Sequence, residues 1–338
     1  MNKRITYDFS YYVSKFLTDY LIKRRNASSH TILSYRDTFK LLIQFLMERG
    51  MKPEKISIEM LNRSLLMNFL AWLQNERNCG IATQNQRLAG IHSFFRYVQE
   101  EDPKYLHITQ GVLAIPYKKS STPIVNYLST DGIKLLLQQP DTSTKLGYRD
   151  FVLLSLMYDT GARVQEVADL TIGNLVFEQL PYIVLTGKGR KSRIVPLMKE
   201  SAQMLRQYVG HFPFPDSRQL SPLFPNRNGQ KISRAGISYI LDKYISQARR
   251  LSPNLIPDIV TPHCVRHSKA MHLLQAGVNL AYIRDFLGHS DIKTTEIYAR
   301  VDSASKRKAL EKAYSNLGPP PDKSWTEDKS LMAWLKSL

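Results

Sequence analysis

The chain has 338 residues, of which 43% are hydrophobic, and it carries 47 Lys and Arg against 29 Asp and Glu, a net charge of +18. That length and hydrophobic content are enough for two buried cores, so a two-domain protein is expected. The composition argues against a disulfide framework, since there are only two cysteines, Cys79 and Cys264. No apolar run approaches the ~20 residues that cross a bilayer, and the start lacks the apolar core of a signal peptide. We therefore expect a cytoplasmic protein with no membrane partner.

The positive charge is shared between the two parts of the chain. Residues 1–119 hold 18 basic and 10 acidic side chains, and residues 120–338 hold 29 and 19. Such an excess predicts a polyanionic partner, of which nucleic acid is the leading candidate. Because both parts are basic, the pattern favours a grip on DNA by two domains over a single basic tail. Plain solubility remains the alternative explanation of the charge.

The first part of the chain is predicted to be a small helical bundle. Apolar residues recur at spacings of three and four over residues 9–25, 29–49, 58–77 and 81–101. Ser28 or Ser29 can cap the second of these helices, and Gly50 and Gly80 mark helix ends. Candidate DNA contacts in this part are Ser34, Arg36, Lys40, Gln84, Asn85 and Arg87.

A linker is predicted next. From Asp102 to Asn126 the helical periodicity is lost and three prolines gather, which is typical of an extended segment. Lys118 and Lys119 form a basic pair in this segment and are further candidate DNA contacts. The predicted division is a helical domain at 1–110, a linker at 111–127, a second domain at 128–316 and a tail at 317–338.

The second part is predicted to be mainly helical with one small antiparallel sheet. Helical patterns at 130–139, 148–158 and 164–170 are followed by two short β-type runs at 182–185 and 192–195. The runs flank Gly187–Lys191, which predicts a hairpin with Lys188 near its turn. If Lys188 donates a proton to a leaving oxygen, Lys191 and Lys199 are nearby alternatives for that role. The hairpin's other basic residues, Arg190, Lys191 and Arg193, are candidate DNA contacts or a solvated basic turn. Helices are expected again at 200–209 and 233–250.

A further helix is predicted from Pro262 to Gln275, with Gly277 as its stop. His263 and Arg266 then project from one face at the helix start, where unpaired backbone N–H groups favour a phosphate. His263, Cys264 and His267 could instead suggest zinc. Cys264 would point away from the histidine face, however, and no second ligand cluster has zinc spacing, so we expect no metal and no cofactor.

Two arginines, two histidines and a tyrosine suit attack on a phosphodiester. The residues are Arg163, His263, Arg266, His289 and Tyr298. A guanidinium fork matches two phosphate oxygens and stabilises charge in the transition state, while histidines exchange protons near neutral pH. Taken alone, each residue also has an ordinary structural explanation, such as a tyrosine packed in a core. Their joint occurrence favours chemistry.

These segments resemble the tyrosine recombinases, the family of phage integrases and Xer-type resolving enzymes. Thr160–Arg163 with Glu166 resembles the family's first arginine box, and Gly187–Gly189 followed by Arg193–Leu197 resembles its lysine hairpin. His263 to Arg266, Leu287 to His289 and Tyr298 resemble the remaining motifs in the right order. The resemblance implies a four-helix, SAM-like core-binding bundle and a mostly helical catalytic domain with a small antiparallel sheet.

The resemblance also implies roles for single residues. Tyr298 would attack the phosphate and form a 3'-phosphotyrosyl bond, while Arg163 and Arg266 would hold the non-bridging oxygens. Lys188 would protonate the leaving 5' oxygen, and His289 would donate a hydrogen bond to the phosphate. His263 would act as a general acid or base, or would hydrogen-bond the phosphate. Glu166 would orient the arginine box. Because the covalent bond stores the energy of the broken ester, no ATP is needed. The tyrosine mechanism that the resemblance implies also needs no metal.

The tail is predicted from its own residues, and the assembly from the resemblance. Residues 303–316 are predicted to be helical, the prolines at 319–321 break that helix, and a last amphipathic piece carries Trp325 and Trp334. Exposed tryptophans favour docking on a neighbouring protomer over folding back. The implied partners are double-stranded DNA, a second copy on each site, a tetramer in the synapse and accessory DNA-bending proteins.

Three functions remain open from the sequence. The first is site-specific strand exchange, with a mobile-element recombinase preferred over an Xer-like dimer resolvase because of the long basic chain and unusual tail. The second is a type IB-like topoisomerase. The third is a DNA-binding protein with a dead active site, which the six filled motif positions disfavour.

Overall fold

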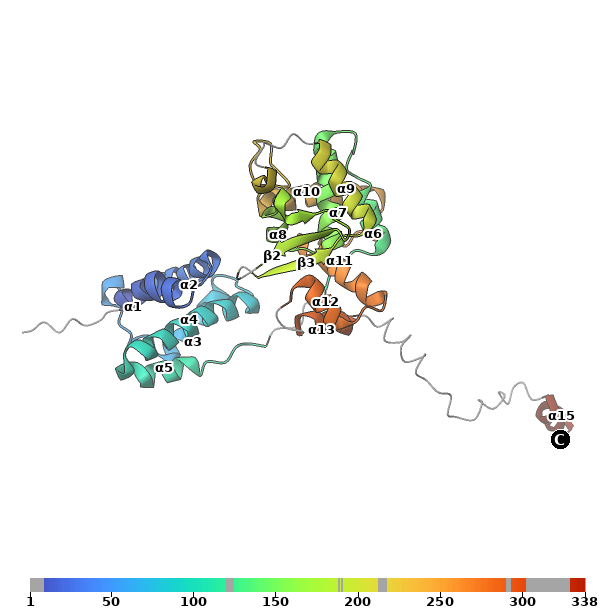
Figure 1. Cartoon of the computed structure of the whole chain (residues 1–338). Helices are drawn as coiled ribbons and strands as arrows, with labels where there is room; N and C mark the ends of the chain where they lie inside the picture. Colours follow the sequence, from blue (N-terminus) through green and yellow to red (C-terminus); the bar gives the residue numbers. More distant parts are fainter. Residues whose placement is uncertain are drawn as a thin grey trace, which may run out of the picture. The chain divides into compact units, whose positions relative to one another are not determined.

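The computed structural model describes residues 9–119, 125–187, 189, 191–211, 218–289, 293–301 and 329–337. The chain divides into two compact units, Met1–Pro123 and Ile124–Leu338 (Figure 1). Each unit has a hydrophobic core of its own.

Unit 1 is built from helices alone in its described part. Its elements are α1 (Phe9–Lys15), a π-helix that continues it (Phe16–Arg24), α2 (Ser29–Glu48), α3 (Arg63–Asn75), α4 (Ile81–Glu101) and α5 (Leu106–Leu113). The predicted helices at 9–25, 29–49 and 81–101 are confirmed, and Ser28 caps α2 through the backbone N–H of Thr31. The predicted helix at 58–77 begins later, at Arg63, because the side chain of Asn62 accepts the N–H of Leu65 and starts the helix there.

The prediction of an extended segment from Asp102 onward was wrong at its start. Residues 106–113 form α5, which packs against α4 and spans the predicted boundary at residue 110. Tyr105, Val112 and Ile115 are buried in the core of unit 1. Their helical periodicity is real, but it is too short to stand out between Pro103 and Pro116.

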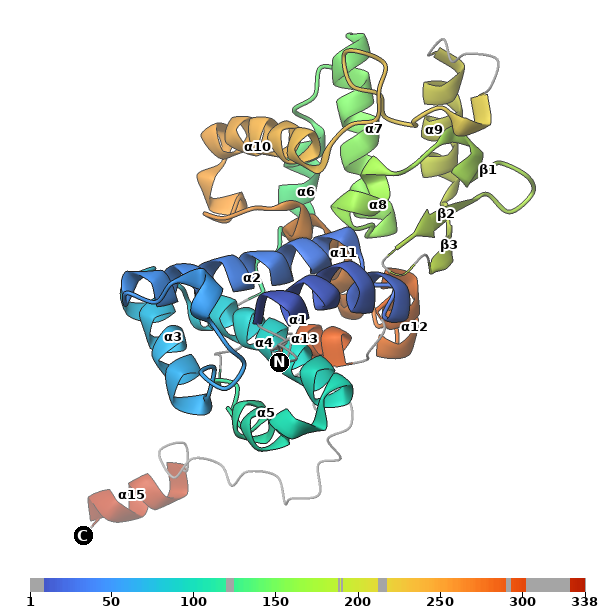
Figure 2. The same cartoon turned by 90° about the vertical axis from the view of Figure 1, so that its left-hand side faces the viewer.

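The core of unit 1 includes a cluster of aromatic rings around α4. This helix contacts α2, α3 and α5, and it lies between α2 and α5 in Figure 2. Phe94 of α4 is 0% exposed, and its ring centroid lies 5.0 Å from that of Phe39, 5.5 Å from Phe16 and 5.9 Å from Phe9. The three contacts are edge-to-face, the arrangement that aromatic quadrupoles favour.

Phe94→Ala should destabilise unit 1 by about 3–5 kcal/mol, the range for removing a fully buried phenylalanine. The cavity cannot close because rings from α1, α2 and the π-helix meet there. Urea unfolding of the full chain, followed by a probe in unit 1, measures the change. Leu106→Ala, at an exposed position of α5, is the control and should cost under about 0.5 kcal/mol. Equal losses from the two variants would contradict this account of the core.

Unit 2 is mainly helical around one small sheet. Its helices are α6 (Thr130–Leu137), α7 (Lys145–Thr160), α8 (Val164–Ala168), α9 (Lys199–His211), α10 (Arg234–Leu251), α11 (Pro262–Gln275), α12 (Leu280–Leu287), α13 (Lys293–Val301) and α15 (Lys329–Ser337). The strands β1 (Leu175–Val176), β2 (Tyr182–Thr186) and β3 (Ser192–Pro196) form an antiparallel sheet in the order β1-β2-β3. The predicted fold class is confirmed, whereas β1, α12 and α13 had no counterpart among the predicted elements.

The predicted hairpin is confirmed in its strands. Thr186 pairs with Ser192 and Tyr182 with Pro196, and the backbone N–H of Gly187 donates to the carbonyl of Lys191 at 2.9 Å. Lys188 and Arg190 lie outside the described residues. β2 contacts α8 and β3 contacts α12, so the sheet links the middle of unit 2 to its carboxy-terminal helices.

Helix α11 has the predicted bounds, 262–275. Proline at the first position has no N–H to leave unpaired, and Gly277 follows the helix with a φ of +84°, which glycine adopts without strain. α11 packs against α12 and α13 (Figure 1). A small core there is formed by the buried residues Val125, Ala270, Met271, Ile283, Leu287 and Tyr298.

The tail is described only in α15, where Trp334 and Leu335 are 57% and 48% exposed. The helix expected at 303–316 and the side chain of Trp325 lie outside the described residues. None of the helices in the described ranges has the length and hydropathy needed to span a bilayer.

Candidate active site

Arg163 is held by a carboxylate and by a helix end. α7 stops at Gly161, which has a φ of +56°, and Arg163 directly precedes α8. Glu166, in the first turn of α8, accepts the backbone N–H of Arg163 and one of its guanidinium nitrogens, each at 2.8 Å. The other terminal nitrogen of Arg163 donates to the carbonyl of Gly288 at 3.0 Å. The guanidinium is thus oriented from two sides.

Arg266, in the second turn of α11, is 3% exposed and has no carboxylate partner among its hydrogen bonds. Its two terminal nitrogens donate to the carbonyls of Gly161 at 2.7 Å and Leu287 at 2.6 Å. Burial, followed by the positive charges of Arg163 and Arg193, lowers the pKa of Arg266 to about 9. The guanidinium of Arg266 stays charged at neutral pH. A bound anion would offset the positive charges around it.

Arg193 of β3 completes this network. Two of its nitrogens donate to the two oxygens of Glu166 at 2.8 Å each, and its Nε donates to the carbonyl of Phe286 at 3.0 Å. Burial alone would raise the pKa of Glu166, but the hydrogen bonds and charges of Arg193 and Arg163 outweigh it and hold that pKa at about 2. Glu166 is therefore ionised throughout the physiological range.

Three consecutive carbonyls at the end of α12 receive the three arginines. Phe286 binds Arg193, Leu287 binds Arg266 and Gly288 binds Arg163. A helix carboxy terminus carries unpaired carbonyls and a partial negative charge, which suits cations. Gly288, with a φ of +66°, ends the helix, and a Cβ there would lie 2.9 Å from Cδ of Arg193. No larger residue fits without moving that side chain.

Tyr298 lies on α13 with its side chain inside the small core; the residue is 1% exposed. Its hydroxyl is hydrogen-bonded to Nδ1 of His267 at 2.9 Å, and its ring stacks on that of His289 with centroids 6.4 Å apart. Burial raises the pKa of Tyr298, while the charges of Arg266 and Arg163 act to lower it. Both arginines are therefore close enough to the phenol to stabilise negative charge on it.

The histidines of the site are neutral at physiological pH. Burial lowers the pKa of His267 and of His289 to about 4, and it lowers that of His263 as well, with the charges of Arg266 and Arg163 adding to the effect at His263 and His289. Nδ1 of His289 is hydrogen-bonded to the hydroxyl of Thr295 at 2.9 Å. A neutral imidazole held in this way presents its other nitrogen for contact with a substrate.

The structure brings five of the six predicted catalytic side chains to one site, together with Glu166. They are Arg163, His263, Arg266, His289 and Tyr298. The sixth, Lys188, lies outside the described residues, but its neighbour Gly187 reaches the site, since a Cβ there would be 2.8 Å from Oε1 of Glu166. The chemical roles of all six stay predictions.

Sequence reasoning missed two contacts of the site. The sequence suggested His267 only as a zinc ligand, although its spacing of four from His263 already placed both rings on one face of α11; their centroids lie 6.3 Å apart. Thr295, which holds His289, has no distinguishing signal in the sequence. In the described ranges, no three His, Cys, Asp or Glu side chains gather in a way that could hold a metal ion.

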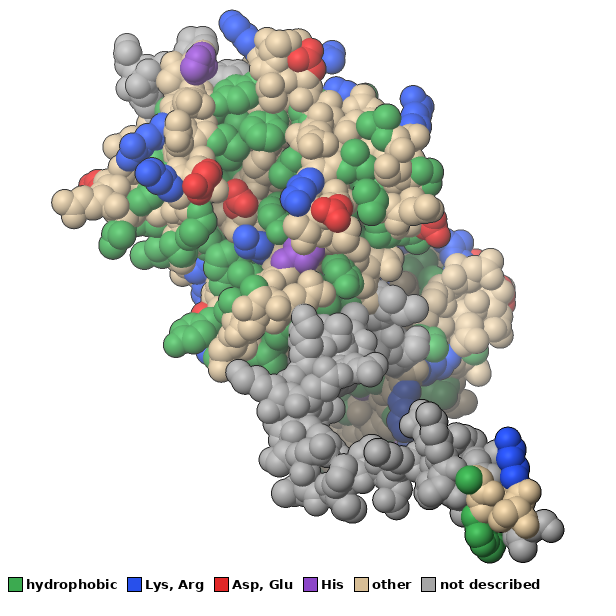
Figure 3. All heavy atoms as spheres, turned by 90° about the vertical axis from the view of Figure 1, so that its right-hand side faces the viewer, with side chains coloured by type: hydrophobic (Ala, Val, Ile, Leu, Met, Phe, Trp, Pro, Cys, Tyr) green, Lys and Arg blue, Asp and Glu red, His purple; other side chains and the backbone are tan. Residues whose placement is uncertain are grey.

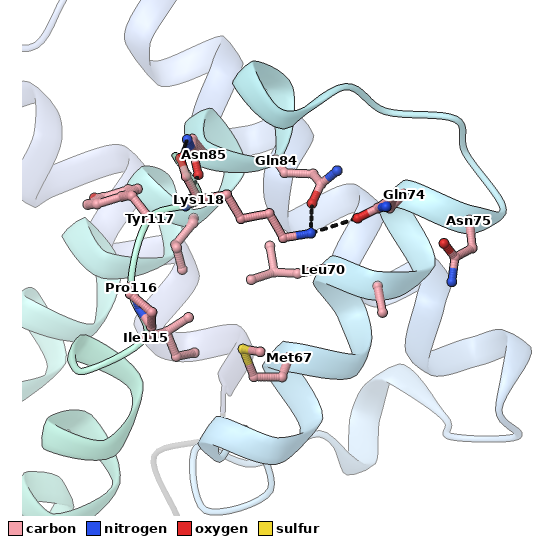
Figure 4. A pocket seen from close by; sticks show the side chains of 12 residues that line it. Met67, Leu70, Gln74, Asn75, Gln84, Asn85, Ile115, Pro116, Tyr117 and Lys118 are labelled. Carbon is pink, nitrogen blue, oxygen red and sulfur yellow. Dashed lines mark hydrogen bonds between the residues drawn. The ribbon is translucent and has the colours of Figure 1, made fainter. Parts of the chain in front are cut away.

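Several candidate DNA contacts of unit 1 have partners inside the unit. The ammonium of Lys118 lies between the amide oxygens of Gln74 and Gln84, at 2.6 and 2.8 Å, beside a cavity of about 390 Å³ (Figure 4). The side chain of Asn85 holds the backbone N–H and carbonyl of Lys118. These residues anchor the chain as it leaves α5, and their contacts with DNA stay predictions.

The remaining candidates are placed as follows. Arg87 donates to the carbonyl of Ser34 at 2.9 Å and so ties α4 to α2. Arg36 is exposed and paired with Asp37. Lys40, Lys119 and Lys191 are exposed, which is compatible with phosphate contacts, whereas Arg193 is 12% exposed in its side chain.

The neutral histidines make folding stability depend on pH. In the folded chain the pKa of His267 and of His289 is about 4, whereas the ordinary value is 6.5. Below pH 6.5 the unfolded chain therefore binds more protons at these two residues than the folded chain does. The free energy of unfolding should therefore fall as the pH drops from about 6.5 to about 4. Each histidine should contribute on the order of 1 kcal/mol to this fall in the free energy of unfolding, after solvent screening is allowed for.

Urea unfolding at pH 7.5 and pH 5 measures this dependence. The variant carrying both His267→Gln and His289→Gln should lose less stability between the two pH values than the original chain. His107→Gln, a change in α5 of unit 1, is the control and should leave the difference unchanged. A double variant with the full pH dependence would rule out these two histidines as its source.

The chain has a helical unit followed by a mainly helical unit, and in the second unit a buried tyrosine lies among histidines and arginines. This combination of fold and site defines the class of tyrosine recombinases. The chain belongs to this family. Residues 126–305 match the phage integrase family, and residues 15–102 match the phage integrase, N-terminal SAM-like domain. Both domains of the family are thus present.

Relatives cover nearly the whole chain. It is 37% identical over 327 residues to "Putative integrase/recombinase y4rC" of Sinorhizobium fredii, covering 96% of this chain and 97% of that protein. It is 33% identical over 293 residues to tyrosine recombinase XerD of Listeria innocua, covering 86% of this chain and 90% of the relative. Among solved structures, XerH bound to its difH substrate is similar with a TM-score of 0.69 and 22% identity, covering 89% and 84% of the two chains.

Proposed function

We propose that this chain is a site-specific recombinase of a mobile element, which breaks and rejoins DNA strands through a 3'-phosphotyrosyl bond to Tyr298. The observation that carries the proposed chemistry is the placement of Tyr298. Its hydroxyl lies in the field of two guanidiniums, Arg163 and Arg266, that are fixed by backbone carbonyls before any substrate binds. Preorganised charge of this kind is the largest single contribution to catalysis in many enzymes.

The two arginines have donors to spare. An arginine carries five N–H groups, and the terminal nitrogens of Arg266 use one each on the carbonyls of Gly161 and Leu287. Arg163 likewise uses two side-chain donors, on Glu166 and Gly288. Three N–H groups of each guanidinium remain for the non-bridging oxygens of a phosphate. The carbonyls fix the orientation, and the remaining donors bind the substrate.

The proposed step exchanges one ester for another. The oxygen of Tyr298 bonds to phosphorus while the bond from phosphorus to the 5' oxygen breaks. Nδ1 of His267 lies 2.9 Å from the hydroxyl and is proposed to accept the phenol proton, and Lys188 is proposed to supply the proton to the leaving oxygen. His263 and His289 are proposed to assist at the phosphate. Attack by a 5'-hydroxyl of another strand reverses the step, so no ATP is consumed.

The proposed partners are double-stranded DNA and further copies of the chain, as a dimer on each site and a tetramer in the synapse. The face drawn in Figure 3 shows Lys and Arg side chains interspersed with acidic and hydrophobic ones among its described residues. The described residues of that face form no continuous basic patch. We place the protein in the cytoplasm, on the nucleoid, and expect the exposed Trp334 and Leu335 of α15 to dock on a neighbouring protomer.

An Xer-like resolvase of chromosome dimers is the second candidate. It is favoured by the identity of 33% to XerD of Listeria innocua, with similar coverage of both chains. The two functions differ in the DNA that reacts. A mobile-element recombinase acts at the ends of the element that carries its gene, whereas a resolvase acts at one chromosomal site.

The test uses duplexes cut from the flanks of the gene and nicked next to the cleavage position, so that the covalent intermediate cannot reverse. We expect an adduct that protease removes, and its DNA-linked peptide should contain Tyr298. Joined products from two differently labelled duplexes would separate strand exchange from the relaxation carried out by a topoisomerase. Absence of any adduct on both the flanking and the chromosomal DNA would overturn the proposal.

A further inference from the structure

Arg193 is bound to its surroundings as firmly as the arginines assigned to the phosphate. It lies on β3, only two residues beyond Lys191, where the hairpin turn closes. Its side chain is 12% exposed, and each of its three guanidinium nitrogens donates a hydrogen bond of 2.8 to 3.0 Å inside unit 2. Lys191, a residue in the same basic run, is exposed by contrast.

The partners of Arg193 are the partners of the catalytic arginines. Both oxygens of Glu166 receive Arg193, and each also binds Arg163, one through the guanidinium and one through the backbone N–H. Phe286, the third partner, directly precedes Leu287 and Gly288, whose carbonyls hold Arg266 and Arg163. Arg193 therefore bonds to both groups that hold Arg163 and Arg266, namely Glu166 and the carboxy-terminal end of α12, the two supports of these arginines.

The geometry also joins the hairpin to those supports. β3 contacts α12, and a side chain that spans from the strand to a carboxylate and to a helix end fixes three separate segments at once. A planar fork that donates to both oxygens of a carboxylate defines direction as well as distance, which a lysine cannot do.

We propose that Arg193 is a positioning residue for strand cleavage: through Glu166 and the end of α12 it sets the orientation of Arg163 and Arg266, and it does not bind DNA itself. The inference rests on the proposed function of the site. Because a displacement of about 1 Å can cost on the order of 100-fold in rate, we expect Arg193→Gln to lower the cleavage rate by roughly that factor. Affinity for the recombination site should stay within about twofold.

The first measurement separates positioning from direct binding to DNA. Site affinity of the full chain is measured at several salt concentrations for the original protein, Arg193→Gln and Lys191→Gln. Removing one side chain that neutralises a phosphate lowers the slope of log affinity against log salt by about 0.9. Arg193→Gln should keep the slope of the original protein. A slope reduced by that full amount in this variant would overturn the inference, whatever happens to Lys191→Gln.

The second measurement is the single-turnover cleavage rate on the nicked duplex, with a mutant cycle. Arg193→Gln, Glu166→Gln and the double variant are compared, and the double variant should be little slower than the slower single one, because both act through the same link. Arg193→Lys keeps the charge without the fork and should recover only part of the rate. If Arg193→Gln does not fold, the cleavage rate of Arg193→Lys still tests the inference. If the rate loss of the double variant equalled the product of the two single losses, the two residues would act independently. That result would contradict the proposed link between Arg193 and Glu166.

A pH profile supplies a readout that loss of packing would not change. Glu166 faces Arg163 on the same turn, Arg193 on β3 and Arg266 on α11. Without Arg193 the pKa of Glu166 rises, so the cleavage rate of Arg193→Gln should fall at a higher pH on the acid side than that of the original protein. A profile of unchanged shape would overturn the inference, while an original protein that forms no adduct would overturn the proposed function as well.

Discussion

Tyr298→Phe should abolish the covalent adduct with DNA, a loss of about 10⁵-fold or more if the phenolic oxygen is the nucleophile. The ring of Tyr298 packs in the core between α11, α12 and α13, and phenylalanine preserves that packing. Only the hydrogen bond to His267 is removed, which costs about 1–3 kcal/mol of stability. The folded protein should therefore bind its site normally and fail only in cleavage. Trapping on the nicked duplex, with site affinity measured alongside, tests this.

Tyr282→Phe is the matched control for that experiment. Tyr282 lies on the neighbouring helix α12 and is 72% exposed, so removal of its hydroxyl should change neither the adduct yield nor the affinity. An adduct of normal yield with Tyr298→Phe would show that another residue attacks the phosphate.

Arg266→Lys should reduce the cleavage rate by about 10³-fold, the loss seen when a single preorganised donor to a transition-state oxyanion is removed. Lysine keeps a positive charge but cannot donate to the carbonyls of Gly161 and Leu287 and to two phosphate oxygens at the same time. We expect the binding affinity for the DNA site to change far less than the rate. Single-turnover cleavage and equilibrium binding on the same duplex measure the two effects.

Arg284→Lys controls for the chemical change itself. Arg284 lies one turn from the end of α12, pairs with Asp285, and has a side chain that is 37% exposed. Its replacement should leave the cleavage rate within about twofold. If Arg266→Lys cleaved at a tenth of the original rate or better, the guanidinium of Arg266 could not be one of the two phosphate clamps.

The elements that could be predicted are those whose ends are marked by residues. α11 has the predicted bounds because Pro262 and Gly277 fix its two ends, and the hairpin strands are framed by Gly187 and Gly189. α5 has eight residues and includes Gly111, so its periodicity is too short to outweigh the prolines around it. α12 also has eight residues, and in the sequence its end at Gly288 stands out only as part of a motif.

The candidate site could be predicted as a set of side chains but not as a network. Motif order identified Arg163, Arg266 and Tyr298 because their chemistry resides in the residue type. The groups that hold the arginines are backbone carbonyls of residues 286–288, which any sequence provides and none reveals. Arg193 illustrates the limit, since its place in a basic run suggested a DNA contact, and only the fold shows its bonds to Glu166.

The crowding of Arg163, Arg193 and Arg266 has a thermodynamic consequence. Their mutual repulsion, offset in part by Glu166, adds to burial in depressing the pKa of Arg266. If Arg163 and Arg266 bind the phosphate as proposed, the anion relieves that repulsion, and we expect the melting temperature of unit 2 to rise with the concentration of target DNA. The folded chain therefore carries a repulsion that negative charge relieves, and a neutral ligand of the same shape should not raise the melting temperature in this way.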